Sequence, residues 1–346
     1  MKKKLVLAGI GFVVGCAITL AACLLIKGNT DEDKASAFAK VGKYKGLEVE
    51  FVSAIKVTDE DVEAAIRTDL QTLDKSTSVN GPAQDGDTVV MDYVGKVDGT
   101  AFEGGTDEDA ELTLGSNTFI DGFEEAIVGH SVGEVFDINV TFPTNYGNEL
   151  AGQDAVFTIT LKKINRLPEL TEELLTELGT TAKTVEEYKK LVRENLEKSN
   201  EETADISNQQ VVLDALLKVC KFKKYPTSRL IRVTKELVYQ ESYGAIMNNL
   251  SIDAAVEQSK GKSVEDAAKD ELLIELAVEI IAEKEDLIIS EEEYSAQCSD
   301  MAAMYGEANV TSFVQSYEMV YGDGYIKRMM LREKVANFLI DKAKAK

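Results

Sequence analysis

The chain has 346 residues, 44% of them hydrophobic, and its 61 acidic side chains outnumber its 38 basic ones to give a formal net charge of -23. This length predicts two or three domains, and the apolar content argues against a disordered protein. The acidic balance argues against nucleic-acid binding, because phosphate contacts need clustered lysines and arginines. With one histidine and four cysteines, none of them at C-x-x-C spacing, no zinc or other metal site is expected.

The N-terminus has the composition of a membrane-directed segment. Three lysines, Lys2 to Lys4, precede an uncharged run from Leu5 to Ile26, after which Lys27 and the acidic stretch GNTDEDK begin. At about 1.5 Å per residue, a helix of this length crosses a roughly 30 Å hydrocarbon layer. The positive flank orients the rest of the chain away from the cytoplasm, so residues 1–27 predict a cell-membrane protein with an extracytoplasmic body.

Two fates of this segment remain open. The stretch Leu20-Ala21-Ala22-Cys23 resembles the lipobox of bacterial lipoproteins, which favours cleavage and lipidation at Cys23. The apolar residues from Leu24 to Ile26 prolong the run and favour a single uncleaved anchor. Val14-Gly15-Cys16 is a weaker second lipobox, and a soluble secreted form is the less favoured third outcome.

The first folded elements follow a tether. Residues 28–43 are expected to be a linker, and folded sequence begins near Tyr44, where YKGLEVEFVSAIKV suggests a strand. Thr58 to Asp61 cap an amphipathic helix that ends near Lys75. The turn-rich stretch SVNGPAQDGD then marks a boundary, so residues 44–84 are expected to form one strand-and-helix segment.

Residues 85–165 change to strand periodicity. TVVMDYVGKV predicts a strand and Asp98-Gly99 a hairpin turn, while ELTLG, VGEVFDINVTF and DAVFTITLKKI predict three further strands. The only helix-length segment among them runs from Phe123 to Val128. We therefore expect an α+β domain of about 80 residues, with a small antiparallel sheet wrapped over a short helix.

Residues 166–346 have the pattern of consecutive helices. Capping boxes begin helices at Thr184 and Ser290, Pro226 begins another, and Gly322 to Gly324 separate two late helices. This half has no catalytic constellation, and the chain has no phosphate-binding loop for ATP. Cys220 and Cys298 could pair if the fold brings them together. Adaptable side chains that either pack the core or line a cradle for varied polypeptides are Tyr239, Tyr243, Met247, Met301, Met304, Tyr305, Tyr317, Met319, Met329 and Met330.

Several stretches resemble one family. DGDTVVMDYVGKVDGTAFEGG, LGSNTFIDGFEEAIVGHSVGE, FPTNYG and LAGQDAVFTITLKKI resemble the FKBP-type peptidyl-prolyl isomerase domain in the version found in trigger factors. YKGLEVE and LPELTEELL beside it, and LREKVANFLIDKAK near the end of the chain, are similar to other parts of that family. The resemblance implies that residues 85–165 are the isomerase domain and that residues 166–346 are the helical chaperone domain. The family's ribosome-docking domain has no counterpart here, so ribosome binding is not expected.

The resemblance also implies an isomerase site. The positions that match the family's site are Tyr93, Phe102, Glu103, Phe119, Ile120, Phe123, Tyr146 and Phe157. The phenylalanines are expected to wall a pocket, the Ile120 N–H to hold a substrate carbonyl, and the polar members of the set to orient the peptide. A residue near Ala110 replaces a further aromatic residue of the family, and the loop after Tyr146 is short, which together imply a more open pocket.

Without the resemblance, these residues have plainer interpretations. Phe119 and Phe123 at helical spacing, and Phe157 in a strand, would pack a core. His130 is interpreted as a solvated turn residue rather than a catalytic base. The acidic run at 107–111, DEDAE, lacks the spacing of a calcium loop and is interpreted as a solvated loop.

A site with no nucleophile suits isomerisation of an X-Pro bond, because no bond breaks and the barrier of about 18 to 20 kcal/mol comes from lost amide resonance. The sequence predicts a membrane-tethered, extracytoplasmic peptidyl-prolyl isomerase and ATP-independent chaperone. Its partners would be unfolded, exported, proline-containing polypeptides, and it would need no cofactor. Two alternatives remain open: a holdase or scaffold in which the isomerase fold only binds peptide, and a cytoplasmic trigger factor variant.

Overall fold

The computed structural model describes residues 34–147 and 149–346, which form two compact units. The helical unit contains residues 34–51 and 208–346, and the sheet unit contains residues 52–207. The predicted α+β class is confirmed. Within the described part of the chain, no helix is both long enough and apolar enough to cross a membrane. The predicted membrane segment, with Cys23, lies outside the described residues.

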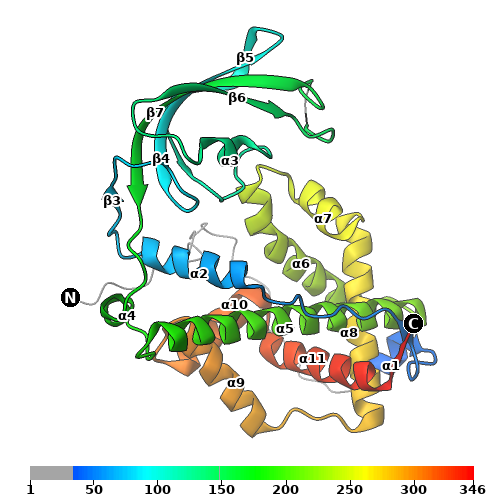
Figure 1. Ribbon diagram of the computed structural model, residues 1–346. Coiled ribbons are helices and arrows are strands. Elements are labelled where there is room, and N and C mark those ends of the chain that lie inside the picture. Colours follow the sequence, from blue (N-terminus) through cyan, green and yellow to red (C-terminus); the bar gives the residue numbers. More distant parts are fainter. Residues whose placement is uncertain (1–33, 148) are drawn as a thin grey trace. The chain divides into compact units, whose positions relative to one another are not determined.

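An antiparallel sheet dominates the sheet unit. Its strands are β3 (Thr77–Ser78), β4 (Thr88–Val97), β5 (Thr100–Thr113), β6 (Val135–Thr141) and β7 (Asp154–Arg166). β7 pairs with β3, β4 and β6, and β4 also pairs with β5, which leaves β5 at an edge. Figure 1 shows the sheet curving around the short helix α3 (Phe123–Ile127), as the strand periodicity predicted.

Alternation along the strands makes one face of this sheet apolar. In β7, Phe157, Ile159 and Leu161 are buried, while the residues between them are more exposed. Helix α3 covers that face with Phe123 and Ile127, which have no exposed surface. Sheet and helix therefore share one core, and any side chain on the inner face lies close to α3.

The β4–β5 hairpin is longer than the sequence predicted. It turns at Asp98 and Gly99, which have φ angles of 49° and 77°, as a tight two-residue turn requires. Strand β5 then runs from Thr100, so the acidic run 107–111 lies in a strand and its interpretation as a loop was wrong. Asp107 to Asp109 are exposed, and charged side chains on an edge strand discourage pairing with another chain.

Three helices form a second, smaller core in the sheet unit. They are α2 (Asp59–Gln71), α4 (Glu172–Leu178) and the first part of α5 (Val185–Lys218). Val62, Ile66 and Leu70, spaced four residues apart, form the buried side of α2, and the predicted cap at Thr58 is present as a capping box. The Tyr188 hydroxyl of α5 donates a 2.7 Å hydrogen bond to Asp69 of α2.

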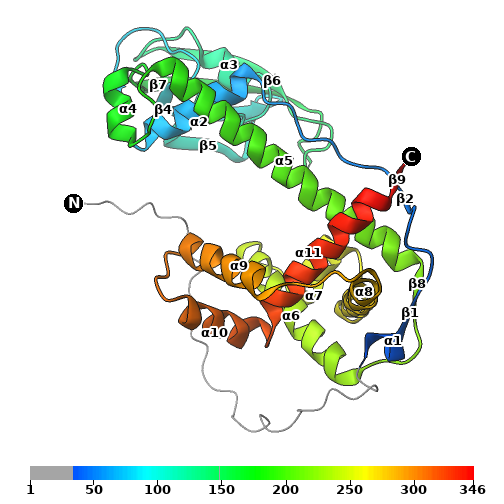
Figure 2. The ribbon, with the colours of Figure 1, turned by 90° about the horizontal axis from the view of Figure 1, so that it is seen from below.

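The helical unit contains the end of α5 and most of the remaining helices. These are α1 (Ala35–Phe38), α6 (Thr227–Met247), α7 (Ile252–Lys260), α8 (Val264–Glu285), α9 (Glu291–Met304), α10 (Val310–Tyr321) and α11 (Tyr325–Lys342). Helix α8 is central, since Leu272, Leu276 and Ile281 are fully buried and it contacts α1, α6, α7 and α11. Figure 2 shows α9 and α10 lying beside each other next to α11.

Two short strand pairs hold the N-terminal segment in this unit. β1 (Ala39–Val41) pairs with β8 (Cys220–Phe222), and β2 (Glu48–Val49) pairs with β9 (Lys344–Ala345). Residues from Ala35 onward, expected to be a linker, thus belong to the core of the helical unit. The strand predicted over 44–57 is reduced to two residues, since β9, which pairs with it from the other end of the described chain, is itself only two residues long.

The unit boundaries differ from the predicted domain boundaries. Residues 44–51 belong to the helical unit, whereas α4 and the first part of α5 belong to the sheet unit. Among the predicted helix starts, Ser290 forms a capping box and Pro226 precedes α6. Thr184 accepts from the Glu187 N–H, but the Glu187 carboxylate accepts from the N–H of Lys183 instead of Thr184.

Candidate active site

Seven aromatic rings form a continuous cluster between the sheet and α3. Phe123 of α3 lies at its centre, with ring centroids 4.4 Å from Phe119, 5.2 Å from Phe157 and 6.2 Å from Tyr93. Six of these rings belong to residues predicted for the site, and the fold brings all six together. The aromatic cluster consists of Tyr93, Phe102, Phe119, Phe123, Phe142, Tyr146 and Phe157.

Phe142, which the sequence reasoning missed, connects two parts of the cluster. Its ring lies 5.6 Å from that of Phe102 and 4.8 Å from that of Tyr146. The sequence contained a sign of this, because Phe142 continues the alternating apolar pattern of Ile138 and Val140, both buried, beyond the end of β6. Tyr146 therefore reaches the rest of the cluster through a phenylalanine that anchors its loop.

Burial divides the cluster into a base and a rim. Phe123, Phe142 and Phe157 are buried, so the plainer interpretation of Phe123 and Phe157 as core residues describes their position. Tyr146 is 40% exposed, and Tyr93, Phe102 and Phe119 are half-buried, as is Ile120. The cluster thus combines a closed apolar base with an accessible aromatic rim, which a core alone does not need.

Two glycines leave room for two of these rings. A Cβ atom on Gly95 would lie 2.5 Å from the Phe157 ring, and one on Gly105 would lie 2.6 Å from the Phe102 ring. Neither contact is one that a real side chain makes, so any larger residue would displace the aromatic ring. The sequence pattern does not reveal these glycines. The Phe157 ring approaches Gly95 from the neighbouring strand β7, and the Phe102 ring approaches Gly105 at an irregularity within β5.

Glu124 holds the loop that carries Phe119. Its buried carboxylate accepts hydrogen bonds from the backbone N–H groups of Asn117 (3.1 Å), Thr118 (2.9 Å) and Phe119 (3.1 Å). The Ser116 hydroxyl donates a further bond of 3.2 Å. Burial works against the charged carboxylate, yet the hydrogen bonds from this loop outweigh burial and lower the pKa of Glu124 below its ordinary value.

The Ile120 N–H comes next in this series and is left without an acceptor among the described residues. The Ile120 carbonyl accepts from the Phe123 N–H at 3.1 Å, which begins the turn into α3. The N–H expected to hold a substrate carbonyl therefore lies in a loop that Glu124 fixes. Glu124 was not among the predicted site residues, although an acidic residue in the first turn of a helix was a visible signal.

The polar members of the predicted site have different surroundings. Burial, and then the charge of Asp107 on the neighbouring strand, raises the pKa of Tyr93. Glu103 is exposed on β5, so the carboxylate that acts on Tyr93 is Asp107 rather than Glu103. Ala110 lies opposite Met91 in the same strand pair. No carboxylate partner of Tyr93 was predicted from the sequence.

His130 lies outside the aromatic cluster. Its Nδ1 is 2.6 Å from a Glu134 carboxylate oxygen, and its ring stacks on Phe136 at 3.5 Å. Its backbone N–H and carbonyl are bonded to Ile127 and Ala83. Its imidazole is therefore occupied by Glu134 and Phe136 and is not directed at any ring of the cluster.

The helical unit exposes part of its methionine and tyrosine content. Tyr243, Met247, Met304 and Met319 are exposed, whereas Tyr317 is half-buried in a row of rings with Phe313 and Tyr321. The methionines and tyrosines that the sequence analysis named for this half are thus divided between core and surface. Cys220 and Cys298, considered as a pair from the sequence, are both buried free thiols, one in β8 and the other in α9.

Comparison with known proteins gives two family matches. Residues 80–162 match the family described as FKBP-type peptidyl-prolyl cis-trans isomerase, and residues 184–341 match the bacterial trigger factor C-terminus. Trigger factor from Thermoanaerobacter sp. (strain X514) is 35% identical over 317 residues, which cover 88% of this chain and 72% of that protein. Trigger factor from Bacillus cereus (strain B4264) is 34% identical over 315 residues, with the same two coverages.

Solved structures with local similarity include one described as "Promiscuous Substrate Recognition in Folding and Assembly Activities of the Trigger Factor Chaperone". It is 20% identical with a TM-score of 0.36 and covers 88% of this chain and 72% of that one. FkpA from Escherichia coli is 21% identical with a TM-score of 0.20 and covers 32% of this chain and 62% of that one.

Proposed function

The chain belongs to the trigger factor family and is a peptidyl-prolyl cis-trans isomerase of the FKBP type with a chaperone domain, and from this premise we propose where and how it works. It is tethered to the cell membrane by residues 1–27 and acts without ATP on exported, unfolded, proline-containing polypeptides on the extracytoplasmic side. Its isomerase site is the rim of the aromatic cluster together with Ile120 and Glu103. The observation that carries the catalytic part is the aromatic rim beside an Ile120 N–H that finds no acceptor in the described part of the chain.

The physical basis is a preference for the twisted amide. Rotation about the C–N bond removes amide resonance, and the twisted form has less charge separation than the planar one. An apolar aromatic surface that excludes water therefore stabilises the twisted form relative to the planar form, which is differential binding of the transition state. This step requires no covalent bond between the enzyme and the peptide.

Each site residue has a distinct role in this proposal. Phe123 and Phe157 form the base, while Phe102 and Phe119 close the sides around the proline ring. The Ile120 N–H donates to a substrate carbonyl, and the Tyr93 and Tyr146 hydroxyls and the Glu103 carboxylate orient the peptide on the exposed rim. Glu124 is a positioning residue, because it acts only through the loop that carries Phe119 and Ile120.

The catalytic proposal is tested by proline-limited refolding of a substrate protein, without a coupled protease. Wild type should accelerate refolding, Tyr93→Phe should retain part of the acceleration, and Phe123→Ala should lose most of it. Phe136→Ala is the matched control, since Phe136 stacks on His130 outside the cluster. No acceleration by the wild type would favour the alternative of a holdase whose isomerase fold only binds peptide.

Chaperone activity is tested separately. A variant without residues 86–165 should still suppress aggregation of an unfolded client if the helical unit carries this activity, whereas its refolding acceleration should disappear. Loss of both activities in a variant that remains helical by circular dichroism would contradict a division of labour between the two units.

The location is supported by the N-terminal sequence, with three lysines before an uncharged run that continues to Ile26. Protease added to intact cells, or to spheroplasts if an outer layer blocks access, should degrade the body while a cytoplasmic marker stays intact. Protection of the body until the cells are lysed would favour the cytoplasmic variant. Incorporation of a labelled fatty acid, lost in Cys23→Ala and kept in Cys16→Ala, distinguishes the two tethers, because only a lipoprotein carries an acyl chain on its cysteine.

A further inference from the structure

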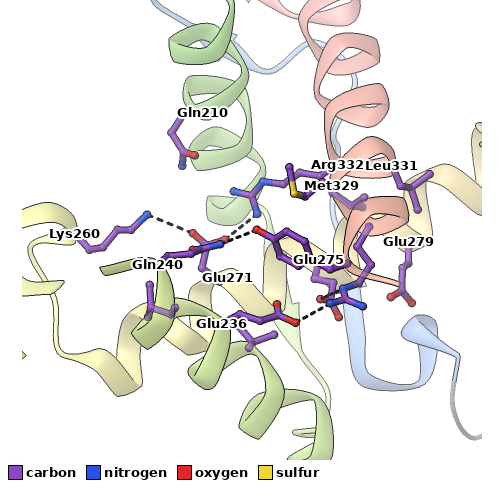
Figure 3. Close-up of a pocket in the computed structure, with 15 residues that line it drawn as sticks. Gln210, Glu236, Gln240, Lys260, Glu271, Glu275, Glu279, Met329, Leu331 and Arg332 are labelled. Atoms are coloured by element: carbon purple, nitrogen blue, oxygen red, sulfur yellow. Dashed lines mark hydrogen bonds and ion pairs between the residues drawn. The ribbon is translucent and has the colours of Figure 1, made fainter. Parts of the chain in front are cut away.

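A cavity of about 330 Å³ lies inside the helical unit, outside the sheet unit and its aromatic cluster. Side chains from α5, α6, α7, α8 and α11 line it. Figure 3 shows Lys260 of α7 and Arg332 of α11 extending toward Glu271 of α8 from different sides. Charged groups from three helices therefore meet at this one place.

Four acidic and three basic side chains line the cavity, and two further arginines outside the lining, Arg229 and Arg232, pair with its carboxylates. With those two arginines counted, the network holds five basic and four acidic side chains, whereas the whole chain has a net charge of -23. The network contains Glu236, Glu271, Glu275 and Glu279 as its acids, and Arg229, Arg232, Lys260, Arg328 and Arg332 as its bases.

The carboxylates of the network already have cationic partners. Glu236 lies 2.8 Å from Arg232 and 2.7 Å from Arg328. Glu275 accepts two hydrogen bonds from Arg232, at 2.5 and 2.7 Å, and has further guanidinium groups within 4 Å. Both oxygens of Glu275 are bonded to Arg232, and the Oε1 of Glu236 accepts from two arginines, so a cationic ligand would compete with guanidinium groups already in place.

Donor capacity remains on the other side of the cavity. A guanidinium has five N–H donors, and Arg332 uses one of them in its 2.8 Å bond to Glu271. Lys260 approaches the same carboxylate at 3.7 Å, which is an ion pair without a hydrogen bond. Two cations thus share one carboxylate, and both retain N–H groups for a second anion.

The remaining lining sets the size and character of a ligand. Val233 and Leu237 of α6, Val278 of α8 and Met329 of α11 supply apolar surface next to the charged groups. A volume of about 330 Å³ lies at the lower end of the range of small-ligand sites. Such a space suits one acidic side chain with an apolar neighbour rather than a folded partner.

We propose that this cavity binds a carboxylate of an unfolded polypeptide, with Lys260 and Arg332 as the anion-binding pair. An acidic chaperone repels acidic segments at long range, and the two cations that share the single Glu271 carboxylate give it a contact for them at short range. Arg332 donates in the fork geometry that matches a carboxylate, Lys260 supplies the second charge, and the α6 side chains pack the neighbouring apolar residue. The proposal rests on the peptide-binding part of the proposed function and not on the isomerase site or the tether.

The test measures peptide binding to the full chain in detergent by fluorescence anisotropy. One labelled peptide carries a single Glu among Leu and Val residues with both termini blocked, and its partner carries Gln instead. The Glu peptide should bind roughly tenfold more tightly, the difference expected for one hydrogen bond between charged groups. A third peptide, with Gln and a free C-terminal carboxylate, shows whether a chain end occupies the same site.

Variants assign the effect to the cavity. Arg332→Gln should weaken binding of the Glu peptide by roughly tenfold and leave the Gln peptide unchanged, and Lys260→Gln should act in the same direction. Lys327→Gln is the matched control, because it removes one positive charge from the same helix at a residue that does not line the cavity. Circular dichroism confirms that each variant is folded, and Lys260 on the short helix α7 provides a second variant if Arg332→Gln unfolds.

Equal binding of the Glu and Gln peptides would overturn the carboxylate site and leave peptide binding by the chaperone domain intact. An equal loss for both peptides in Arg332→Gln would also overturn it, since the arginine would then be only a support for the helices. If no peptide binds, both the carboxylate site and the peptide-binding role of the helical unit are contradicted. Refolding acceleration at the aromatic cluster would still report on the isomerase independently.

Discussion

The aromatic cluster and the charged cavity differ in the kind of side chain that they bring together. The cluster collects seven rings on an apolar base, where removal of water is the source of its chemistry. The cavity collects charges whose acids are already paired and whose bases retain donors. If both proposals hold, one chain contacts the apolar and the acidic parts of an unfolded polypeptide through two sites with different dependence on salt, pH and side-chain volume.

The largest difference between the two sites should follow from Phe123→Ala. This change removes the central, fully buried ring of the cluster and should lower the free energy of unfolding of the sheet unit by about 3–5 kcal/mol. Urea unfolding followed by circular dichroism measures the loss. Binding of the Glu peptide to the helical unit should not change, and a parallel loss there would show that the sites are not independent.

Gly95→Ala should also affect only the cluster. The new Cβ would meet the Phe157 ring at 2.5 Å, so that ring must move, at a cost of about 1–3 kcal/mol in unfolding free energy and with reduced refolding acceleration. Gly81→Ala is the matched control, because its added Cβ would meet only open space among the described residues. Full activity in Gly95→Ala would mean that the position of Phe157 is unimportant for catalysis.

Glu124→Gln should change the pH dependence of the sheet unit. The pKa of Glu124 is lower in the folded state than in the unfolded chain, so its contribution is fully present above the unfolded value of about 4.3. That contribution is lost as the pH falls through the folded pKa.

The variant should therefore lose about 1–3 kcal/mol at neutral pH and should show a flatter dependence of unfolding free energy on pH below about pH 5. Glu125→Gln, at an exposed neighbouring position, is the control. The KM of the isomerase for a peptide substrate should rise in Glu124→Gln, because Ile120 would be less well held. An unchanged pH profile would contradict the role given to the carboxylate.

The smallest expected effect is that of salt concentration, which should weaken peptide binding at the charged cavity but not refolding acceleration at the aromatic cluster. Raising the ionic strength from about 0.1 M to about 1 M shortens the Debye length from about 10 Å to about 3 Å. Binding of the Glu peptide should weaken severalfold, while refolding acceleration at the aromatic cluster should stay nearly constant. Equal sensitivity of both measurements would remove the distinction between an apolar and a charged site.

Local patterns were reliable where neighbours in sequence are also neighbours in space. The strand at 88–97, the turn at Asp98-Gly99 and the capping boxes at Thr58 and Ser290 were predicted correctly, because each depends on residues a few positions apart. The acidic run 107–111 was misread as a loop, since its composition is unusual for a strand and only the pairing with β4 reveals it as an edge.

Non-local contacts account for the other errors. The short strand at Glu48 pairs with residues near the end of the chain, and no local signal encodes that partner. Asp107 lies opposite Tyr93 only through the register of β4 and β5, and its charge helps to raise the pKa of that tyrosine. Phe142 and Glu124 had weak local signals, but their roles depend on where a ring and a loop meet.

The sequence by itself determined the family, the α+β class and six of the seven rings of the aromatic cluster, because motif spacing and hydrophobic periodicity are local properties. Only the tertiary structure decided which of those rings are base and which are rim, and that the Ile120 N–H has no acceptor within residues 34–147 and 149–346. It alone also brought Lys260 and Arg332 to one carboxylate, since charges that lie far apart in the sequence become a site only when helices from several parts of the chain pack together.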